Sequence, residues 1–132
     1  MTQLEFYFGL SGLWIAVAWV PYILERFTSR GIMGTFANPS PDAPAQAAWA
    51  QRAKAAHKVG VETFVAFGPL ALYASLKLPE DGYPGFLAMT YFWGILAHYV
   101  IYCFGIPVLR TVAFLVASLS TVALALRVLG WI

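Results

Sequence analysis

The residues most capable of chemistry in this chain lie in one short segment, RAKAAHKVGVE, from Arg52 to Glu62. On a helix, Lys54, Lys58 and Glu62 are each four residues from the next and share one face, with His57 one step around it. An apolar run follows, so Glu62 is an ionisable group at the edge of a hydrocarbon layer, where such a group is costly and usually functional. The same residues could instead be interfacial anchors, with Glu62 paired to Lys58. Both interpretations are open on spacing alone.

A second set of polar residues lies on either side of the short connection between the third and fourth apolar runs. His98 and Tyr102 are four residues apart on one helical face, and Arg110 opens the next apolar run, followed by Thr111. A cation at a helix N-terminus is unfavourable unless a negative ligand is present, because free amides and the helix dipole are already positive there. These residue types suit a small zwitterionic or polyanionic ligand. We predict no metal site, because the two histidines and Glu62 lack any known ligand spacing.

The composition places these residues in a membrane. The 132 residues are 61% hydrophobic and 11% charged, and the mean hydropathy is +0.72. A soluble domain carries about 25% charged residues, so we expect an integral membrane protein that forms one domain over residues 1–132. The net charge of +2 and the absence of a basic patch interleaved with aromatics argue against nucleic-acid binding. We expect membrane lipid to surround the protein as a partner.

Four apolar runs are long enough to span a bilayer as helices. Short connections between them predict an all-α, up-down four-helix bundle. We expect Pro21 to kink the first helix and residues 25–46, rich in Gly and Pro, to form the one substantial loop, with helix resuming near Ala45. The predicted spans are residues 4–27, 45–78, 84–104 and 107–129.

Basic residues predict the orientation of these spans. Six lie at one membrane face and two, Lys77 and Arg127, at the other, so we expect the first and third connections in the cytoplasm and both termini outside. In a bacterium this would be the inner membrane. The starts of spans two and four and the end of span three then meet at the cytoplasmic face, where Glu62, His98, Tyr102 and Arg110 can share one site. The six residues are Arg26, Arg30, Arg52, Lys54, Lys58 and Arg110.

Three motifs in these segments, AAHKVGVE, HYVIY and GIPVLRT, resemble the MAPEG family, the membrane-associated proteins of eicosanoid and glutathione metabolism. The resemblance covers nearly the whole chain. It implies a homotrimer of four-helix subunits that binds glutathione between neighbouring subunits near the cytosolic face. By position it implies that Arg110 stabilises the glutathione thiolate, the nucleophilic form of a thiol. Glu62, His98 and Tyr102 match positions that contact glutathione, and Thr111 matches the small hydroxyl neighbour of the arginine. With Lys58, which offers further positive charge to the ligand, these are the residues that we expect to bind glutathione.

The chain also departs from the family pattern at four positions. Ala55 and Val59 replace an arginine and an asparagine of the usual Arg-Ala-His-x-Asn-x-x-Glu motif, and Ile95 replaces an arginine three residues before the histidine. Phe114 stands where some members have an aromatic hydroxyl. Polar ligand groups left unpaired cost about 1–3 kcal/mol each, so we expect weakened glutathione binding. Restoring Asn at Val59 and Arg at Ile95 should tighten it.

Two classes of function follow from these observations. The first is a membrane enzyme, a glutathione transferase or peroxidase acting on a lipophilic substrate that enters from the bilayer. The second is a non-catalytic MAPEG-like membrane protein that binds a lipid or another anionic ligand. A transporter fits less well, because a four-span subunit lacks inverted repeats and broken midplane helices.

Overall fold

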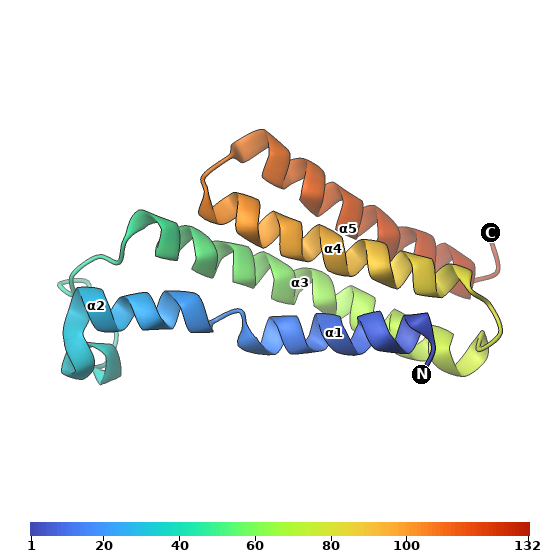
Figure 1. Ribbon diagram of the computed structural model, residues 1–132, viewed down its shortest axis with the longest axis horizontal. Helices are drawn as coiled ribbons and strands as arrows, with labels where there is room; N and C mark the ends of the chain where they lie inside the picture. Colours follow the sequence, from blue (N-terminus) through green and yellow to red (C-terminus); the bar gives the residue numbers. More distant parts are fainter.

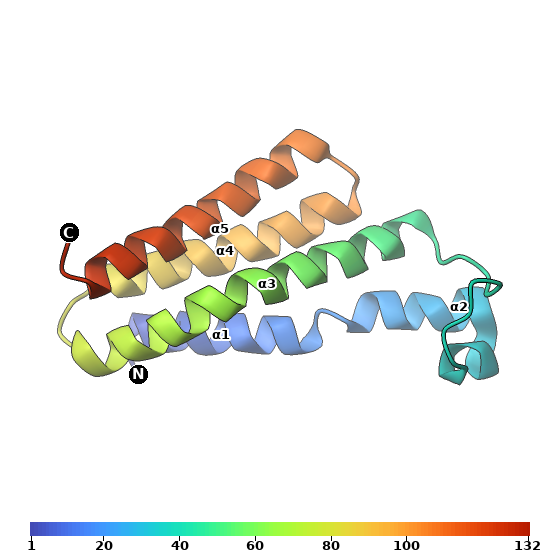
Figure 2. The same cartoon turned by 180° about the vertical axis from the view of Figure 1, so that it is seen from behind.

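The computed structural model describes all 132 residues and consists of helices joined by short connections. The two figures show α1 and α2 running end to end along α3, with α4 and α5 forming a hairpin packed beside them (Figures 1 and 2). Both chain termini lie at the same end of the bundle (Figure 1). The helices are α1 (Gln3–Val17), α2 (Val20–Phe36), α3 (Ala48–Lys77), α4 (Tyr83–Cys103) and α5 (Pro107–Val128).

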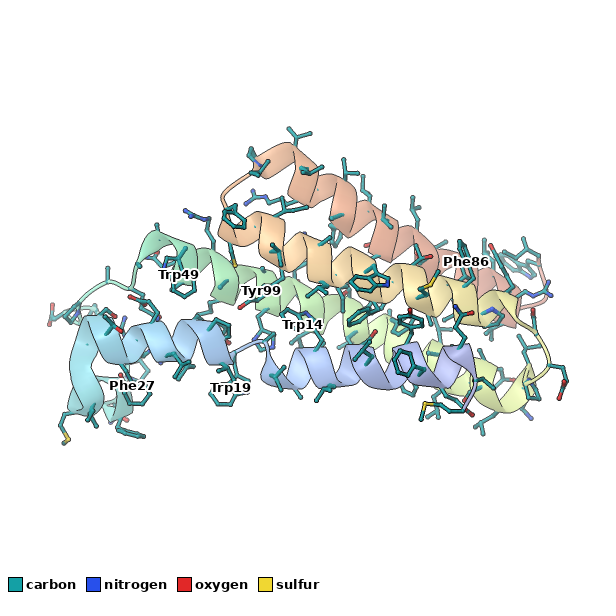
Figure 3. All side chains as sticks on the ribbon, viewed as in Figure 1. Trp14, Trp19, Phe27, Trp49, Phe86 and Tyr99 are labelled. Carbon is teal, nitrogen blue, oxygen red and sulfur yellow. The ribbon has the colours of Figure 1, made fainter.

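Four helical stretches are long and apolar enough to cross a membrane, because α1 and α2 together form one of them, Gln3–Phe36. The all-α four-helix bundle expected from the sequence is therefore confirmed. Large apolar side chains cover the outside of the molecule, among them Leu24 at 60% and Leu76 at 70% exposure. Such an exterior is unfavourable in water and is what lipid chains solvate. Trp19, in the break before α2, and Phe27 of α2 point outward, away from α3 (Figure 3).

The first span is longer than the sequence predicted. Helix continues to Phe36 instead of ending near residue 27, so the connection is residues 37–47 and the expected loop over residues 25–46 is wrong in its first half. Gly31 interrupts the helix with φ of +69°, a conformation that costs glycine little. The helix resumes for one more turn because the prolines that cannot continue it begin only at Pro39.

The kink predicted from Pro21 lies two to three residues before it, between α1 and α2. Two backbone carbonyls that a continuous helix would pair, those of Ile15 and Ala18, are free of backbone donors here. His57 Nε2 donates to the Ile15 carbonyl at 2.9 Å, and the Tyr99 hydroxyl donates to the Ala18 carbonyl at 2.9 Å. Unpaired polar groups are costly in lipid, so these side chains make the break tolerable.

The same histidine also receives a hydrogen bond. Because Nε2 of His57 donates to a carbonyl, Nδ1 is the acceptor of the neutral ring, and the Tyr22 hydroxyl donates to it at 2.8 Å. Trp14 packs edge-on against the Tyr99 ring at 5.0 Å (Figure 3). We call Tyr22, His57 and Tyr99 the polar latch. It joins α1, α2, α3 and α4 at mid-bundle.

Helix α3 begins at Ala48, three residues after the predicted start. The Glu25 carboxylate accepts from the Ala47 amide at 3.1 Å and from the Gln46 side chain at 2.9 Å. The Gln46 side chain also donates to the Tyr22 carbonyl at 2.7 Å. Helix α2 thus holds the chain in place immediately before α3, and Pro44 keeps the preceding residues out of the helix.

The interior is packed with alanines and stacked aromatic rings. Phe67 of α3 and Tyr91 of α4 are fully buried and stack with ring centroids 3.7 Å apart. The Tyr91 hydroxyl pairs with Thr63 at 3.0 Å, so the buried phenol has a partner. At the end near the termini, Arg127 pairs with Asp81 at 2.6 Å and holds α5 against the turn before α4. Hydrogen bonds from Arg127 and from the Tyr83 backbone keep the pKa of Asp81 below its usual value.

Candidate functional site

The turn between α4 and α5 positions the candidate site. Gly105 has φ of +74° and Pro107 occupies the first turn of α5, which allows a sharp reversal within three residues. No side chain caps α5, and the amides of Val108 and Leu109 have no hydrogen-bond partner within the chain. The beginning of α5 is therefore an exposed positive helix end.

Arg110 lies against this helix end and against α4. Its guanidinium carbon is 4.1 Å from the centre of the Tyr102 ring, a cation–π contact. Neither of the two ion pairs in the chain includes Arg110, so its charge has no carboxylate partner. Glu62 pairs with Lys58, the pairing expected if both are interfacial anchors, and not with Arg110. The guanidinium is half-buried and fixed in place by an aromatic face.

His98 completes this group, which we call the corner cluster: His98, Tyr102 and Arg110. Its Nδ1 donates to the Arg110 carbonyl at 2.9 Å, and its ring meets the Tyr102 ring edge-on at 5.5 Å. His98 is 7% exposed, and its Nε2 is buried without a partner. Since Nδ1 carries the proton, Nε2 is an unused acceptor in the neutral ring. The sequence predicts one site shared by Glu62, His98, Tyr102 and Arg110, and these contacts join the last three but not Glu62.

Thr111 lies beside Arg110 at the same helix end and is exposed. Its hydroxyl donates to the Pro107 carbonyl at 3.0 Å, a bond within its own helix. The hydroxyl oxygen retains lone pairs that can accept from a ligand. Thr111 is thus placed next to the corner cluster without being part of its contacts.

Lys58 and Glu62 lie on a different surface. They pair with each other at 4.0 Å on α3, and their side chains are 78% and 63% exposed. No hydrogen bond or ion pair of the chain joins either residue to Arg110. Within one chain, the structure therefore brings together three of the predicted site residues and leaves these two facing outward.

Arg52 has a role that the sequence did not indicate. The sequence places it among the basic residues at one membrane face, but its Nε and one terminal nitrogen both donate to the Cys103 carbonyl, at 3.0 and 2.9 Å. A methyl group at Gly105 would lie 3.4 Å from the Arg52 guanidinium carbon. Arg52 therefore closes the end of α4 and supports the turn that places Arg110. Only the tertiary position of that turn reveals this.

The positions that depart from the family pattern fall in two environments. Ile95 is 5% exposed and belongs to the main hydrophobic core. An arginine there would be buried among apolar side chains, so restoring it is expected to destabilise this chain, and that part of the prediction changes. Val59 is half-buried, and Phe114 lies 6.1 Å from the His98 ring. Val59 is the position at which a polar side chain can be restored.

The family comparison agrees with this architecture. The model of the MAPEG family matches residues 4–130 of the chain. No curated protein and no solved structure matches the chain. Because the match covers nearly every residue, the chain belongs to the MAPEG family. Membership brings with it a membrane location, and the family includes glutathione transferases and peroxidases as well as non-catalytic members.

Proposed function

We propose that this MAPEG-family chain is a membrane-bound glutathione-dependent transferase or peroxidase whose activating residue is Arg110. The observation that carries the proposal is an unpaired, half-buried guanidinium at an uncapped helix N-terminus. Both features stabilise an anion at the same point. A glutathione thiol bound there would lose its proton more readily, because the thiolate gains a charge-assisted contact in a setting of low dielectric.

The thiolate would then react with a substrate dissolved in the bilayer. In a transferase reaction the thiolate sulfur attacks an electrophilic carbon, a carbon–sulfur bond forms, and the bond from that carbon to its leaving group breaks, so the leaving group departs with the electron pair. In a peroxidase reaction the thiolate attacks the terminal oxygen of a lipid hydroperoxide and the oxygen–oxygen bond breaks, so the alkoxide leaves and takes a proton to become the alcohol. A second glutathione then reduces the resulting sulfenic acid, which gives glutathione disulfide and water. Exposed apolar side chains, among them Val108 at 76% and Val112 at 50% exposure, flank Arg110 on α5 and give a lipophilic substrate a surface to approach along.

The rest of the site would come from a neighbouring subunit of a homotrimer. Lys58 and Glu62 are exposed and partnered only with each other, and their helix face is not covered by the chain itself. Glutathione carries two carboxylates and one ammonium group. Lys58 suits a carboxylate, Glu62 suits the ammonium, and Tyr102 and Thr111 offer hydroxyls near the thiol. A site divided between subunits accounts for the separation of these residues within one chain.

His98 would act mainly by holding the corner in place. Its Nδ1 bond to the Arg110 carbonyl ties the first turn of α5 to α4. Its unused Nε2 is a buried acceptor, which a donor on the ligand reaches only if the neighbouring side chains move. The orphaned atom is an observation of this chain that fits a bound polar molecule, because buried polar atoms in proteins normally have a partner.

A second function deserves testing on one observation. Val59 and Ile95 place apolar side chains where the family pattern has polar ones, and Ile95 is part of the core. A non-catalytic MAPEG-like membrane protein that binds a lipid or another anion would keep the corner cluster and dispense with those polar partners. The two functions differ in whether glutathione binds the folded protein.

Thermal unfolding with glutathione distinguishes them. A ligand that binds only the folded state raises the melting temperature, by an amount that grows with its concentration. We expect glutathione to raise the melting temperature of the detergent-solubilised protein, and Lys58→Gln to reduce the shift. Lys77→Gln is the matched control, since it removes the same exposed charge from the opposite end of α3. No shift at saturating glutathione would favour the non-catalytic function.

A further inference from the structure

A second group of cations, separate from the corner cluster, surrounds a cavity of about 250 Å³ between the end of α2, the following connection and α3. Arg26 and Arg30 come from α2 and Lys54 from α3, so two separate segments bring three positive charges together. None of the three forms an ion pair. No carboxylate lines the cavity, whose polar lining also includes Thr35, Ser40 and Gln46.

The hydrogen bonds of these cations leave most of their donors unused. Arg30 Nε donates to the Pro44 carbonyl at 2.8 Å, which fixes the guanidinium at the cavity. Arg26 reaches Gln46 only at 3.5 Å, and its Nε is buried without a partner. Lys54 makes no hydrogen bond or ion pair within the chain, and the Ser40 hydroxyl accepts from Asp42 and remains free to donate.

No carboxylate forms an ion pair with these cations, neither Glu25 on α2 nor Asp42 in the connection. Glu25 lies on the same helix, but its two oxygens accept from the Ala47 amide and the Gln46 side chain. Three like charges around one cavity repel one another. An anion with several acceptor oxygens would remove that repulsion and pair the free donors, and a phosphate group has the charge and the acceptors to do both.

The surface beside the cavity indicates what carries the phosphate. The last turn of α2, after the Gly31 break, exposes Ile32 at 66%, Met33 at 82% and Phe36 at 75%. Figures 1 and 2 show this turn bent away from the bundle axis, beyond the α4–α5 turn. Phe36 packs edge-on against Phe27 at 5.9 Å, so these apolar side chains form one patch next to the cations. Apolar and basic side chains arranged in this way bind the interface of an anionic membrane.

We propose that Arg26, Arg30 and Lys54 bind the phosphate of an anionic phospholipid, with the Phe27–Phe36 patch resting against its acyl chains. This site is independent of the glutathione proposal, since none of its residues belongs to the corner cluster or to the Lys58–Glu62 pair. It would anchor the end of the bundle that extends beyond the α4–α5 turn, and fix the connection before α3.

The test compares nanodiscs of phosphatidylcholine with nanodiscs containing phosphatidylglycerol, using the full-length protein. We expect phosphatidylglycerol to raise the melting temperature of the parent protein and of the control Lys77→Gln. Each of the variants Arg30→Gln and Lys54→Gln should need about fivefold more phosphatidylglycerol for the same rise. Lys54→Gln decides the result if Arg30→Gln loses stability with its Pro44 contact, because Lys54 makes no hydrogen bond in the chain.

Two results would overturn the proposal. Equal responses of Lys54→Gln and Lys77→Gln would show that only the overall charge matters. Inorganic phosphate that gives the same rise in phosphatidylcholine nanodiscs, lost in the same variants, would show that the cavity takes a free anion and not a lipid.

Discussion

The polar latch and the corner cluster contain the same kinds of side chain in opposite states of completion. In the latch, His57 Nε2 and the Tyr99 hydroxyl donate to two carbonyls that the helix break exposes, and both nitrogens of His57 have partners. In the corner cluster, Nε2 of His98 is unpaired and Arg110 has no counter-ion. A histidine inside a membrane bundle is therefore not by itself a sign of chemistry. Unused donors and acceptors are the better indicator, because lipid penalises them unless something else is gained.

The difference between the polar latch and the corner cluster is tested most directly by asking whether residues of another subunit complete the corner cluster. We expect Arg110→Ala and Glu62→Gln each to abolish glutathione-dependent activity as homotrimers. Co-expressed, they should recover activity at about a third of the interfaces of each mixed trimer, because in a ring an intact Glu62 of one subunit then meets an intact Arg110 of the next at one of the three interfaces. Purification with two different tags isolates the mixed trimers. Mixed trimers as inactive as the parents would place both residues in the same subunit's site, and crosslinking that stops at the dimer would exclude the trimer itself.

The latch should behave as structure alone. In His57→Leu the Tyr22 hydroxyl and the Ile15 carbonyl lose their partner, at a cost of about 1–3 kcal/mol each. The cost of each lost partner falls toward about 0.6 kcal/mol if the unfolded chain finds other hydrogen-bond partners in lipid. Thermal unfolding should show the loss, while activity per folded molecule stays constant. If His57→Leu keeps its stability but loses activity, His57 acts in the functional site and not only in holding the helices together.

Restoring the polar side chain of the family pattern at Val59 on α3 should have a smaller effect. Val59→Asn gives glutathione one more hydrogen-bonding group from a half-buried position, and we expect about fivefold tighter binding, since a typical hydrogen bond contributes about 1 kcal/mol. Calorimetric titration of the purified protein measures it. Val61→Asn, at an exposed position two residues away, is the control. Equal affinities of the two variants would mean that Val59 does not face the ligand.

We expect the smallest effect on stability from the Asp81–Arg127 pair, at the end of the bundle opposite the corner cluster. The pKa of Asp81 is lowered in the folded protein by Arg127, so the pair stabilises the fold above the usual pKa of 3.8 and this stability is lost as pH falls through the folded value. Between neutral pH and about pH 5 it should contribute a constant amount. As pH falls, the melting temperature of the parent should therefore fall further than that of Asp81→Asn, because the variant has no ion pair to lose. Parallel pH curves for the parent and the variant would show that the pair contributes nothing.

Much of this architecture could be predicted because it depends on properties of single segments. The length of each apolar run identifies a span, and the i,i+4 spacing of His98 and Tyr102 places them on one face before any packing is known. The position of Arg110 after Pro107 likewise follows from local rules for helix starts.

The remainder depends on partners distant in the chain. Nothing near Arg52 in the sequence indicates that it caps the end of α4, and nothing near His57 indicates the broken helix that it serves. The extension of α2 to Phe36 was missed because Gly31 and Gly34 resemble loop residues, whereas a single positive φ only bends the helix. Ile95 seemed a missing polar partner until its burial in the core was seen.

The central claim is that Arg110 stabilises a glutathione thiolate, and the ultraviolet absorbance of bound thiolate at neutral pH tests it most directly. Arg110→Lys keeps the charge but loses the planar guanidinium and its contact with the Tyr102 ring. We predict that the thiolate absorbance and the turnover rate both fall sharply in Arg110→Lys, while Arg127→Lys at the other end of α5 retains both. Unchanged absorbance and an unchanged rate in Arg110→Lys would contradict the claim and leave Arg110 as an interfacial anchor.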